Sequence, residues 1–303
     1  MSDSGSVLVT GASSQIGVFL LPRLDAADFQ ALAVSRQAPA EPVNVAGSIS
    51  WFGPETVPGS ISWFGPETVP GSADFLVSCG PLRLACRSVE DGASFRKVVA
   101  FSTSSLHTKM DSADDAERDL LSEIAEEEDR LKSLCNERGI GLVLIRPTLV
   151  YGCGLDRNLS LLLSFGERTG VIPVSRLADG LRQPVHADDL AGLAVSALTK
   201  ETGHLLKGEA CGGSTLSYRE MTERVAACGR RRIRVLSLPQ RLLIALLGLR
   251  KDLNPEMVRR QAVDMTFDDT PFRQKLGYNP RPFNPARADF SIPSVQQAFR
   301  LPL

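Results

Sequence analysis

The chain has 303 residues, which is enough for one large domain or two small ones. Hydrophobic residues make up 43% of it and charged residues 23%, an ordinary composition for a soluble globular protein. The formal net charge of −1 gives no overall electrostatic attraction to nucleic acid or to a membrane surface. Residues 1–6 lack the apolar core of a signal peptide, and the longest apolar run, Leu242 to Leu247, is far too short to span a bilayer. The six cysteines show no C-x-x-C spacing, so we expect buried thiols in a reducing cytoplasm and no metal site.

A strand, a tight turn and a helix are predicted at the start of the chain, where the apolar residues from Val7 lead into Thr10-Gly11 and then into Ile16-Gly17. Gly11 permits the turn, and Gly17 lets the helix lie close to the sheet. Ser14 stands where a dinucleotide-binding fingerprint usually has its middle glycine. A helix N-terminus offers unpaired N–H groups and a partial positive charge, so this turn is suited to phosphate. The residues that we expect to hold a cofactor diphosphate are Gly11, Ser13, Ser14, Gln15, Ile16 and Gly17. A plain strand-to-helix turn is the alternative.

The next apolar run, Ala31 to Val34, predicts a second strand that ends at Ser35-Arg36. In dinucleotide-binding folds an acidic residue near this strand end holds the ribose hydroxyls of NAD, whereas an arginine accommodates the 2′-phosphate of NADP. The nearest acidic residues are Asp28 and Glu41, and neither stands at the strand end. Ser35 and Arg36 therefore favour NADP over NAD. A solvated surface arginine is the alternative.

Residues 48–59, SISWFGPETVPG, are repeated without change at 60–71. Repeat proteins usually have three or more diverged units, so two identical copies indicate a recent duplication or a cloning accident. Each copy begins with strand-like alternation and ends in Gly and Pro turn residues. We expect one copy to form a third strand at or near the sheet edge, and the sequence leaves open which copy it is.

Strands and helices then alternate along the chain. We expect strands at 74–78, 97–101 and 142–145, a helix after Pro81 that ends near Asp91, and a long helix at 113–138. This order predicts a parallel sheet with helices on both faces. The acidic residues from Asp114 to Asp129 are interpreted as a solvated face of the long helix, because leucines and an isoleucine provide its apolar stripe.

The pattern changes near residue 150, where Gly and Pro turns separate shorter predicted elements at 159–168, 188–199, 217–228 and 239–249. This predicts a smaller lobe over the carboxyl ends of the strands, where such folds bind their ligands. We expect a first domain of residues 1–150 and a second of residues 151–303, with strands of the second returning to the sheet of the first. A membrane-surface role of the helix at 239–249 is the alternative to its packing on the lobe.

Five segments, in order, resemble the extended short-chain dehydrogenase/reductase superfamily, in particular its NAD-dependent epimerase/dehydratase branch that acts on nucleotide sugars. They are Thr10 to Gly17, Phe101 to Ser105, Arg146 to Gly152, Pro184 to Ala191 and Leu276 to Tyr278.

The resemblance implies an α/β fold, a Rossmann-like doubly wound parallel sheet with a smaller C-terminal substrate lobe, that binds NAD or NADP. It implies that Ser104 occupies the family's catalytic Ser/Thr position and that Ser78, Ser102 and Pro147 border the cofactor. It also implies that His186 and Asp188 form a structural corner near the pocket.

The chain departs from the family at its acid–base pair. The family has Tyr-x-x-x-Lys on the helix after the serine strand, where the lysine lowers the tyrosine pKa for proton exchange with a substrate hydroxyl. Leu120 and Ile124 stand at these positions, and none of the three tyrosines lies in this helix. Apolar side chains cannot transfer a proton, so the family's usual mechanism does not carry over.

The loop after the serine strand offers replacements. Lys109 is a candidate acid or electrostatic stabiliser and His107 a candidate base, while solvated loop residues are the alternative for both. Tyr151 either lines the pocket or is a structural tyrosine.

We therefore expect an oxidoreductase or epimerase that acts on a small polar hydroxyl compound such as a sugar nucleotide, with Ser104 and Lys109 as catalytic residues. A homodimer is compatible with this interpretation, which involves neither nucleic acid nor a membrane span. The alternative is a non-catalytic NADP-binding redox sensor or assembly subunit, which Leu120 and Ile124 favour.

Overall fold

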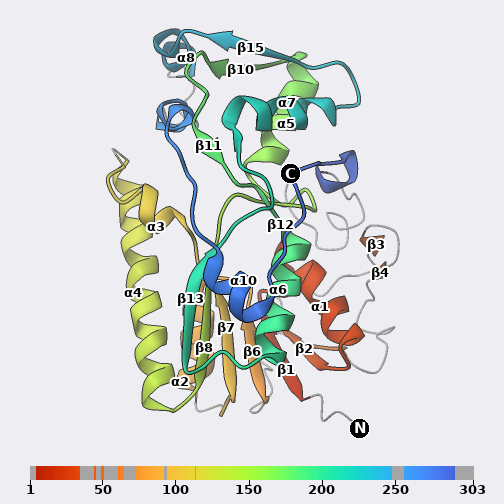
Figure 1. Ribbon diagram of the computed structural model, residues 1–303, viewed down its shortest axis with the longest axis vertical. Helices are drawn as coiled ribbons and strands as arrows, with labels where there is room; N and C mark the ends of the chain where they lie inside the picture. The colour runs from red at the N-terminus through yellow and green to blue at the C-terminus, as the bar shows by residue number, and fades with distance from the viewer. Residues whose placement is uncertain are drawn as a thin grey trace.

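The computed structural model describes residues 5–34, 44–45, 49–50, 61–64, 73–91, 94–112, 114–247 and 256–290. Its centre is a seven-stranded parallel sheet in the order β13-β8-β7-β6-β1-β2-β5 (Figure 1). The strands are β1 (Ser6–Thr10), β2 (Gln30–Val34), β5 (Ile61–Phe64), β6 (Phe75–Ser78), β7 (Lys97–Phe101), β8 (Gly141–Pro147) and β13 (Leu205–Ala210). The strand order reverses between β1 and β6, and at such a switch point the carboxyl ends of the strands leave a crevice for ligands.

Helices cover both faces of this sheet, as near-continuous apolar strands require. α1 (Gly17–Ala26), α6 (Ala187–Thr199) and α10 (Thr270–Leu276) pack on one face, and α2 (Leu82–Glu90) and α4 (Asp115–Glu137) pack on the other. Side chains of β1 alternate between the two faces of the sheet. Val7 and Val9 point into the core under α1, α6 and α10, and Leu8 points into the core under α2 and α4. The doubly wound parallel sheet expected from the sequence is confirmed.

The edge strand beyond β2 comes from the second copy of the duplicated segment. β5 pairs with β2 from Ala31 opposite Ile61 to Val34 opposite Phe64. In the first copy, β4 (Ile49–Ser50) pairs with β3 (Asn44–Val45) in a separate antiparallel ladder. The prediction that one copy supplies a strand at the sheet edge is therefore confirmed.

A further group of elements lies beyond the carboxyl ends of the strands, at the top of Figure 1. Its larger elements are α5 (Leu159–Thr169), β10 (Val171–Ser175), α7 (Tyr218–Ala227), β15 (Arg234–Leu238) and α8 (Gln240–Leu247). β10 and β15 form a parallel pair, and buried side chains such as Leu163, Met221 and Val174 fill the space beneath them. The shorter elements are α3 (Ser105–Thr108), β9 (Val150–Tyr151), β11 (Leu181–Arg182), β12 (Val185–His186), β14 (Leu216–Ser217), α9 (Glu256–Arg259), η1 (Arg260–Ala262) and η2 (Arg287–Phe290).

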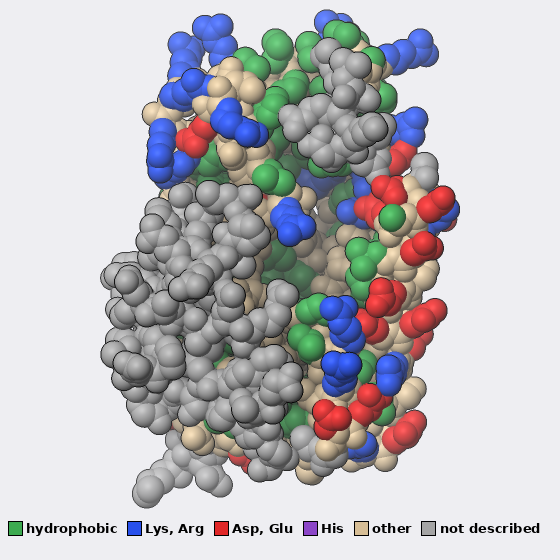
Figure 2. Space-filling model, turned by 180° about the vertical axis from the view of Figure 1, so that it is seen from behind, with side chains coloured by type: hydrophobic (Ala, Val, Ile, Leu, Met, Phe, Trp, Pro, Cys, Tyr) green, Lys and Arg blue, Asp and Glu red, His purple; other side chains and the backbone are tan. Residues whose placement is uncertain are grey.

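Charge is unevenly divided along the chain. Residues 1–150 hold more Asp and Glu than Lys and Arg, and residues 151–303 hold more Lys and Arg. Figure 2 shows acidic side chains along one side of the molecule and basic side chains around its top. Within the ranges that the structure describes, no helix has both the length and the apolarity needed to cross a membrane.

The acidic residues of α4 do not all face solvent, which corrects the interpretation of this run as a solvated face. Glu128 is only 2% exposed, and Arg146 of β8 and Lys207 of β13 reach its carboxylate. The two basic residues come from strands that are distant in sequence, so the helix pattern alone could not reveal them.

Candidate functional site

The turn between β1 and α1 packs its backbone tightly against neighbouring backbone segments. Gly11 has a φ of +68°, and a Cβ added to it would lie 2.5 Å from the backbone nitrogen of Gly80. A Cβ on Gly17 would collide with the carbonyl oxygen of Ala12. Both positions therefore require glycine, one for its backbone conformation and both for the space.

The same turn presents unused hydrogen-bond donors. Ser14 closes it, because its N–H donates to the Gly11 carbonyl (2.9 Å) and its hydroxyl accepts from the Gly17 N–H (3.2 Å). No acceptor among the described residues binds the backbone N–H of Gln15 or of Ile16. The side-chain nitrogen Nε2 of Gln15 is buried and also without a partner in the described part of the chain. Free donors at the start of a ten-residue helix suit an anion such as a diphosphate.

The neighbouring strand ends complete this half of the crevice. The Ala12 N–H donates to the Val34 carbonyl (3.2 Å), which ties the turn to the end of β2. The Thr10 hydroxyl donates to the hydroxyl of Ser78, which is fully buried beneath the turn (2.9 Å). Ser78 therefore ties the end of β6 to the end of β1. Ser35 and Arg36, the residues expected to select NADP, lie outside the described residues.

The ends of β7 and β8 form the other half. The Ser104 N–H donates to the carbonyl of Pro147 (3.2 Å), so these two candidate residues lie side by side. Ser104 is 8% exposed, and its hydroxyl has no hydrogen-bond partner within the described ranges. The Ser102 hydroxyl, in contrast, donates to Glu128 Oε1 (2.6 Å).

The two positions of the family's Tyr-x-x-x-Lys pair hold apolar side chains, so neither can transfer a proton. Leu120 is 55% exposed, and Ile124 packs partly buried beside the core under α4. Tyr151 is 2% exposed in a cluster of rings with His186 and Phe283, where burial raises its pKa. Tyr151 is thus the structural tyrosine that was one of the two alternatives.

Lys109 is part of an ion-pair network. Its Nζ lies 3.2 Å from Glu117 Oε1, and Arg260 of η1 binds the same carboxylate through two nitrogens. The Ser112 hydroxyl donates to Glu117 Oε2 (2.6 Å). The hydrogen bonds from Arg260, with further contributions from Ser112 and Lys109, lower the pKa of Glu117 to about 2. This network ties the loop before α4 to the elements above the sheet.

A second charged network lies under α3, and most of its members were not singled out from the sequence. Glu128 accepts from Arg146 Nε (2.8 Å) and Nη2 (2.6 Å), and Lys207 Nζ lies 3.4 Å from the same carboxylate. Burial disfavours the charge on Glu128, but the hydrogen bonds from Arg146 and Ser102 and the nearby positive charges keep its pKa below the usual value.

The outer end of this network holds the candidate base. His107 Nε2 lies 2.8 Å from Glu209 Oε1 and 2.8 Å from Arg146 Nη1. Lys207 and Glu209 alternate along β13, which is a period-2 signal that sequence could have offered, but their partners depend on the register with β8.

His186 and Asp188 belong to a structural corner, as the resemblance implied. Asp188 pairs with Arg23 of α1 (2.5 Å) and with Arg281 (2.5 Å). His186 is buried, and its Nδ1 accepts from the Asp188 N–H (3.1 Å). The corner holds α1, α6 and the tail of the chain together.

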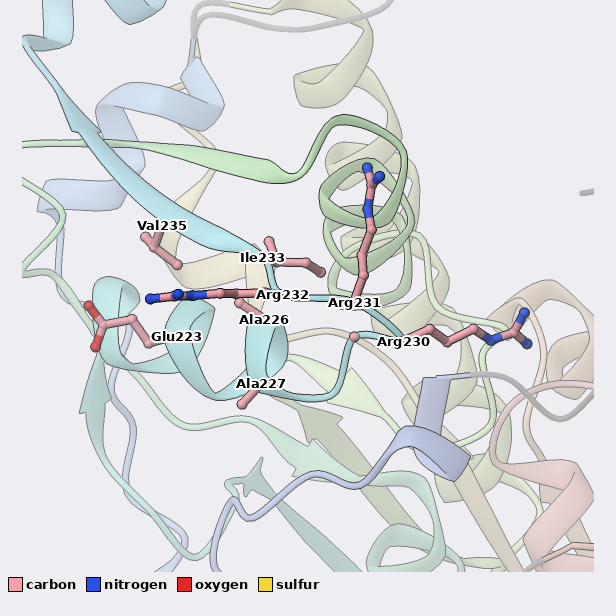
Figure 3. Close-up of a pocket in the computed structure, with 9 residues that line it drawn as sticks. Glu223, Ala226, Ala227, Arg230, Arg231, Arg232, Ile233 and Val235 are labelled. Atoms are coloured by element: carbon pink, nitrogen blue, oxygen red, sulfur yellow. The ribbon is translucent and has the colours of Figure 1, made fainter.

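A shallow cavity of about 610 Å³ lies elsewhere, beside the end of α7 and the start of β15. Figure 3 shows that Arg230, Arg231 and Arg232 extend from its rim in different directions and do not converge on one point. The described residues hold no group of His, Cys, Asp and Glu side chains that could bind a metal ion. The candidate site is the edge of the sheet between the β1–α1 turn and Ser104, where the free donors of the turn and the ends of β7 and β8 lie.

Comparison with known proteins supports the fold of this site. No family model and no curated protein matches the chain. MoeE5 in complex with UDP-glucuronic acid and NAD is 18% identical, over 96% of this chain and 99% of that chain, with a TM-score of 0.67. UDP-glucuronic acid 4-epimerase from Bacillus cereus in complex with NAD is 12% identical, over 97% and 99%, with a TM-score of 0.66. The Bordetella bronchiseptica enzyme WbmF in complex with NAD+ is 13% identical, over 97% and 92%, with a TM-score of 0.65. The chain thus shares the overall fold of these proteins along nearly its whole length.

Proposed function

We propose that the protein binds a nicotinamide dinucleotide in this crevice and acts as an oxidoreductase or epimerase on a polar hydroxyl compound of the sugar-nucleotide class. The observation that carries the proposal is the β1–α1 turn, where two obligatory glycines and the free N–H groups of Gln15 and Ile16 face the switch point of the sheet. MoeE5, whose fold is similar, holds NAD together with UDP-glucuronic acid.

Two groups of residues would bind the two halves of the cofactor. Gly11, Ser13, Ser14, Gln15, Ile16 and Gly17 would hold the diphosphate, and Ser35 and Arg36 would hold the adenosine ribose. Ser102 and Pro147 would border the nicotinamide, and Ser78 would support the turn. When bound, the cofactor supplies a hydride acceptor. Residues 151–303 would form most of the substrate lobe, and their excess of basic side chains would attract an anionic substrate.

NADP should bind more tightly than NAD, because Arg36 follows β2 and no carboxylate stands beside it. A charge-assisted hydrogen bond from an arginine to the 2′-phosphate contributes about 1–3 kcal/mol. Calorimetric titration of both cofactors into the parent and Arg36→Ala tests this. Equal affinities, or an unchanged NADP affinity in Arg36→Ala, would contradict the preference for NADP while leaving dinucleotide binding intact.

Ser104 would hydrogen-bond the reacting substrate oxygen, since its hydroxyl is free of partners in the described chain. Lys109 would act as an electrostatic stabiliser, with its charge held in place by Glu117. The test is turnover of a panel of UDP-sugars by the parent, Ser104→Ala and Lys109→Ala. Turnover that both substitutions abolish supports these roles. Tight cofactor binding with no turnover on any member of the panel would favour a non-catalytic sensor or assembly subunit.

A further inference from the structure

His107 lies next to Ser104 at the mouth of the crevice. The His107 N–H donates to the Ser104 carbonyl (3.1 Å), so the two residues are one turn apart. Ser104 is the N-cap of α3 and His107 lies within that helix, so both side chains stand on the same short turn of the chain. The His107 side chain is 47% exposed and its Nε2 is bound, so Nδ1 is the ring nitrogen open to a ligand.

A donor and an acceptor compete for Nε2. Arg146 Nη1 can donate to it, and Glu209 Oε1 can accept from it, both at 2.8 Å. Arg146 is already compensated by two hydrogen bonds to Glu128. Glu209 Oε1 also lies 3.6 Å from Arg146 Nη1, so the carboxylate and the guanidinium interact directly as well as through the ring. The guanidinium cannot accept a hydrogen bond, so donation from the ring to the Glu209 carboxylate would leave the proton on Nε2 and a lone pair on Nδ1.

We propose that His107 is the acid–base residue that replaces the missing tyrosine, and that Glu209 is the positioning residue that holds it in the required tautomer. The inference rests on the proposed function, because it needs a substrate hydroxyl beside Ser104. A bound nicotinamide would supply the hydride acceptor, and His107 Nδ1 would take the proton of the substrate hydroxyl as its O–H bond breaks and a C=O bond forms. The imidazolium returns that proton when the carbonyl is reduced again.

The tautomer can be measured without any substrate. The chain has three histidines, so imidazole nitrogen signals of ¹⁵N-labelled protein can be assigned by single substitutions. We expect His107 to carry its proton on Nε2 in the neutral parent, and Glu209→Gln to increase the Nδ1-protonated form, because an amide has no charge to favour Nε2–H. A parent that carries the His107 proton on Nδ1, or a tautomer that Glu209→Gln leaves unchanged, overturns the positioning role.

Kinetics test the proton transfer itself. His107→Gln should lower kcat on the UDP-sugar panel by about 10²–10⁴-fold with cofactor affinity within about twofold of the parent, since a positioned acid–base group contributes that much. Glu209→Gln should lower kcat by at least about tenfold and alter the pH profile, because a wrong tautomer removes the proton acceptor. His204→Gln, which changes an exposed histidine elsewhere, is the matched control and should behave as the parent does.

Two failures can be told apart. If His107→Gln keeps kcat within about threefold of the parent, proton transfer by His107 is refuted while the proposed function stands. If the parent binds neither NAD nor NADP by calorimetry, the proposed function is wrong, and with it the proton-transfer role of His107.

Discussion

Replacing Glu128 with glutamine should destabilise the folded protein by about 3 kcal/mol, because removal of one partner from a buried ion pair costs about 3–5 kcal/mol. The carboxylate is 2% exposed and binds two nitrogens of Arg146, which is itself 7% exposed. The substitution removes the carboxylate that binds this buried guanidinium directly. We take the lower end of the range because Glu209 remains 3.6 Å from Arg146. For a chain of this length, that loss lowers the melting temperature by about 5 °C.

Thermal and urea denaturation of the parent and Glu128→Gln measure this loss. The matched control is Asp129→Asn on the same helix, whose side chain is 79% exposed and should change stability by less than about 0.5 kcal/mol. The double variant Glu128→Leu/Arg146→Met removes both charges and should recover most of the loss. If Glu128→Gln is within about 1 kcal/mol of the parent, or the double variant is no more stable than the single one, the reasoning about the buried pair is refuted.

Three further predictions concern other parts of the molecule. Gly17→Ala should weaken cofactor binding at least about tenfold by calorimetry, because a Cβ there collides with the Ala12 carbonyl. The control Gly141→Ala has room for its Cβ and should bind the cofactor normally. Equal affinities of the two variants would contradict the need for tight backbone packing at this turn. The low pKa of Glu117, about 2, gives stability that is fully present above the pKa of an unfolded glutamate and is lost as pH falls through the folded value. The difference in unfolding free energy between the parent and Glu117→Gln should therefore shrink from pH 7 to pH 3. A difference that stays constant across this range would refute the prediction. Deletion of residues 60–71 yields the same sequence as deletion of 48–59 and should leave a folded, cofactor-binding chain. The remaining copy still follows β2 after more than the dozen or so residues that a parallel crossover needs. A deletion variant that circular dichroism shows to be unfolded would mean that the fold needs both copies.

The dinucleotide turn could be predicted from sequence because its determinants are local. Gly11, Ser14 and Gly17 are neighbours in the chain, and the apolar runs on either side define β1 and α1 directly. The alternation of later strands and helices was equally readable, since parallel strands buried on both faces give continuous apolar runs. These features determined the doubly wound sheet and the place of the crevice.

The duplicated segment marks one limit of sequence. Both copies have identical strand-forming residues, so no local pattern could distinguish them. The second copy forms β5 because its Ile61–Phe64 lies beside β2 in the folded chain. The choice between two identical segments is a long-range one, because it depends on which of them pairs with β2.

The charged network under α3 was decided by tertiary structure alone. Glu128 lies on the buried side of α4. Only the pairing of β13 with β8 brings Glu209 next to Arg146 and within reach of His107. A slip of one residue in that register would turn Lys207 and Glu209 to the opposite face of the sheet. The sequence by itself determined which residues could carry charge at the crevice, and strand register determined which of them meet.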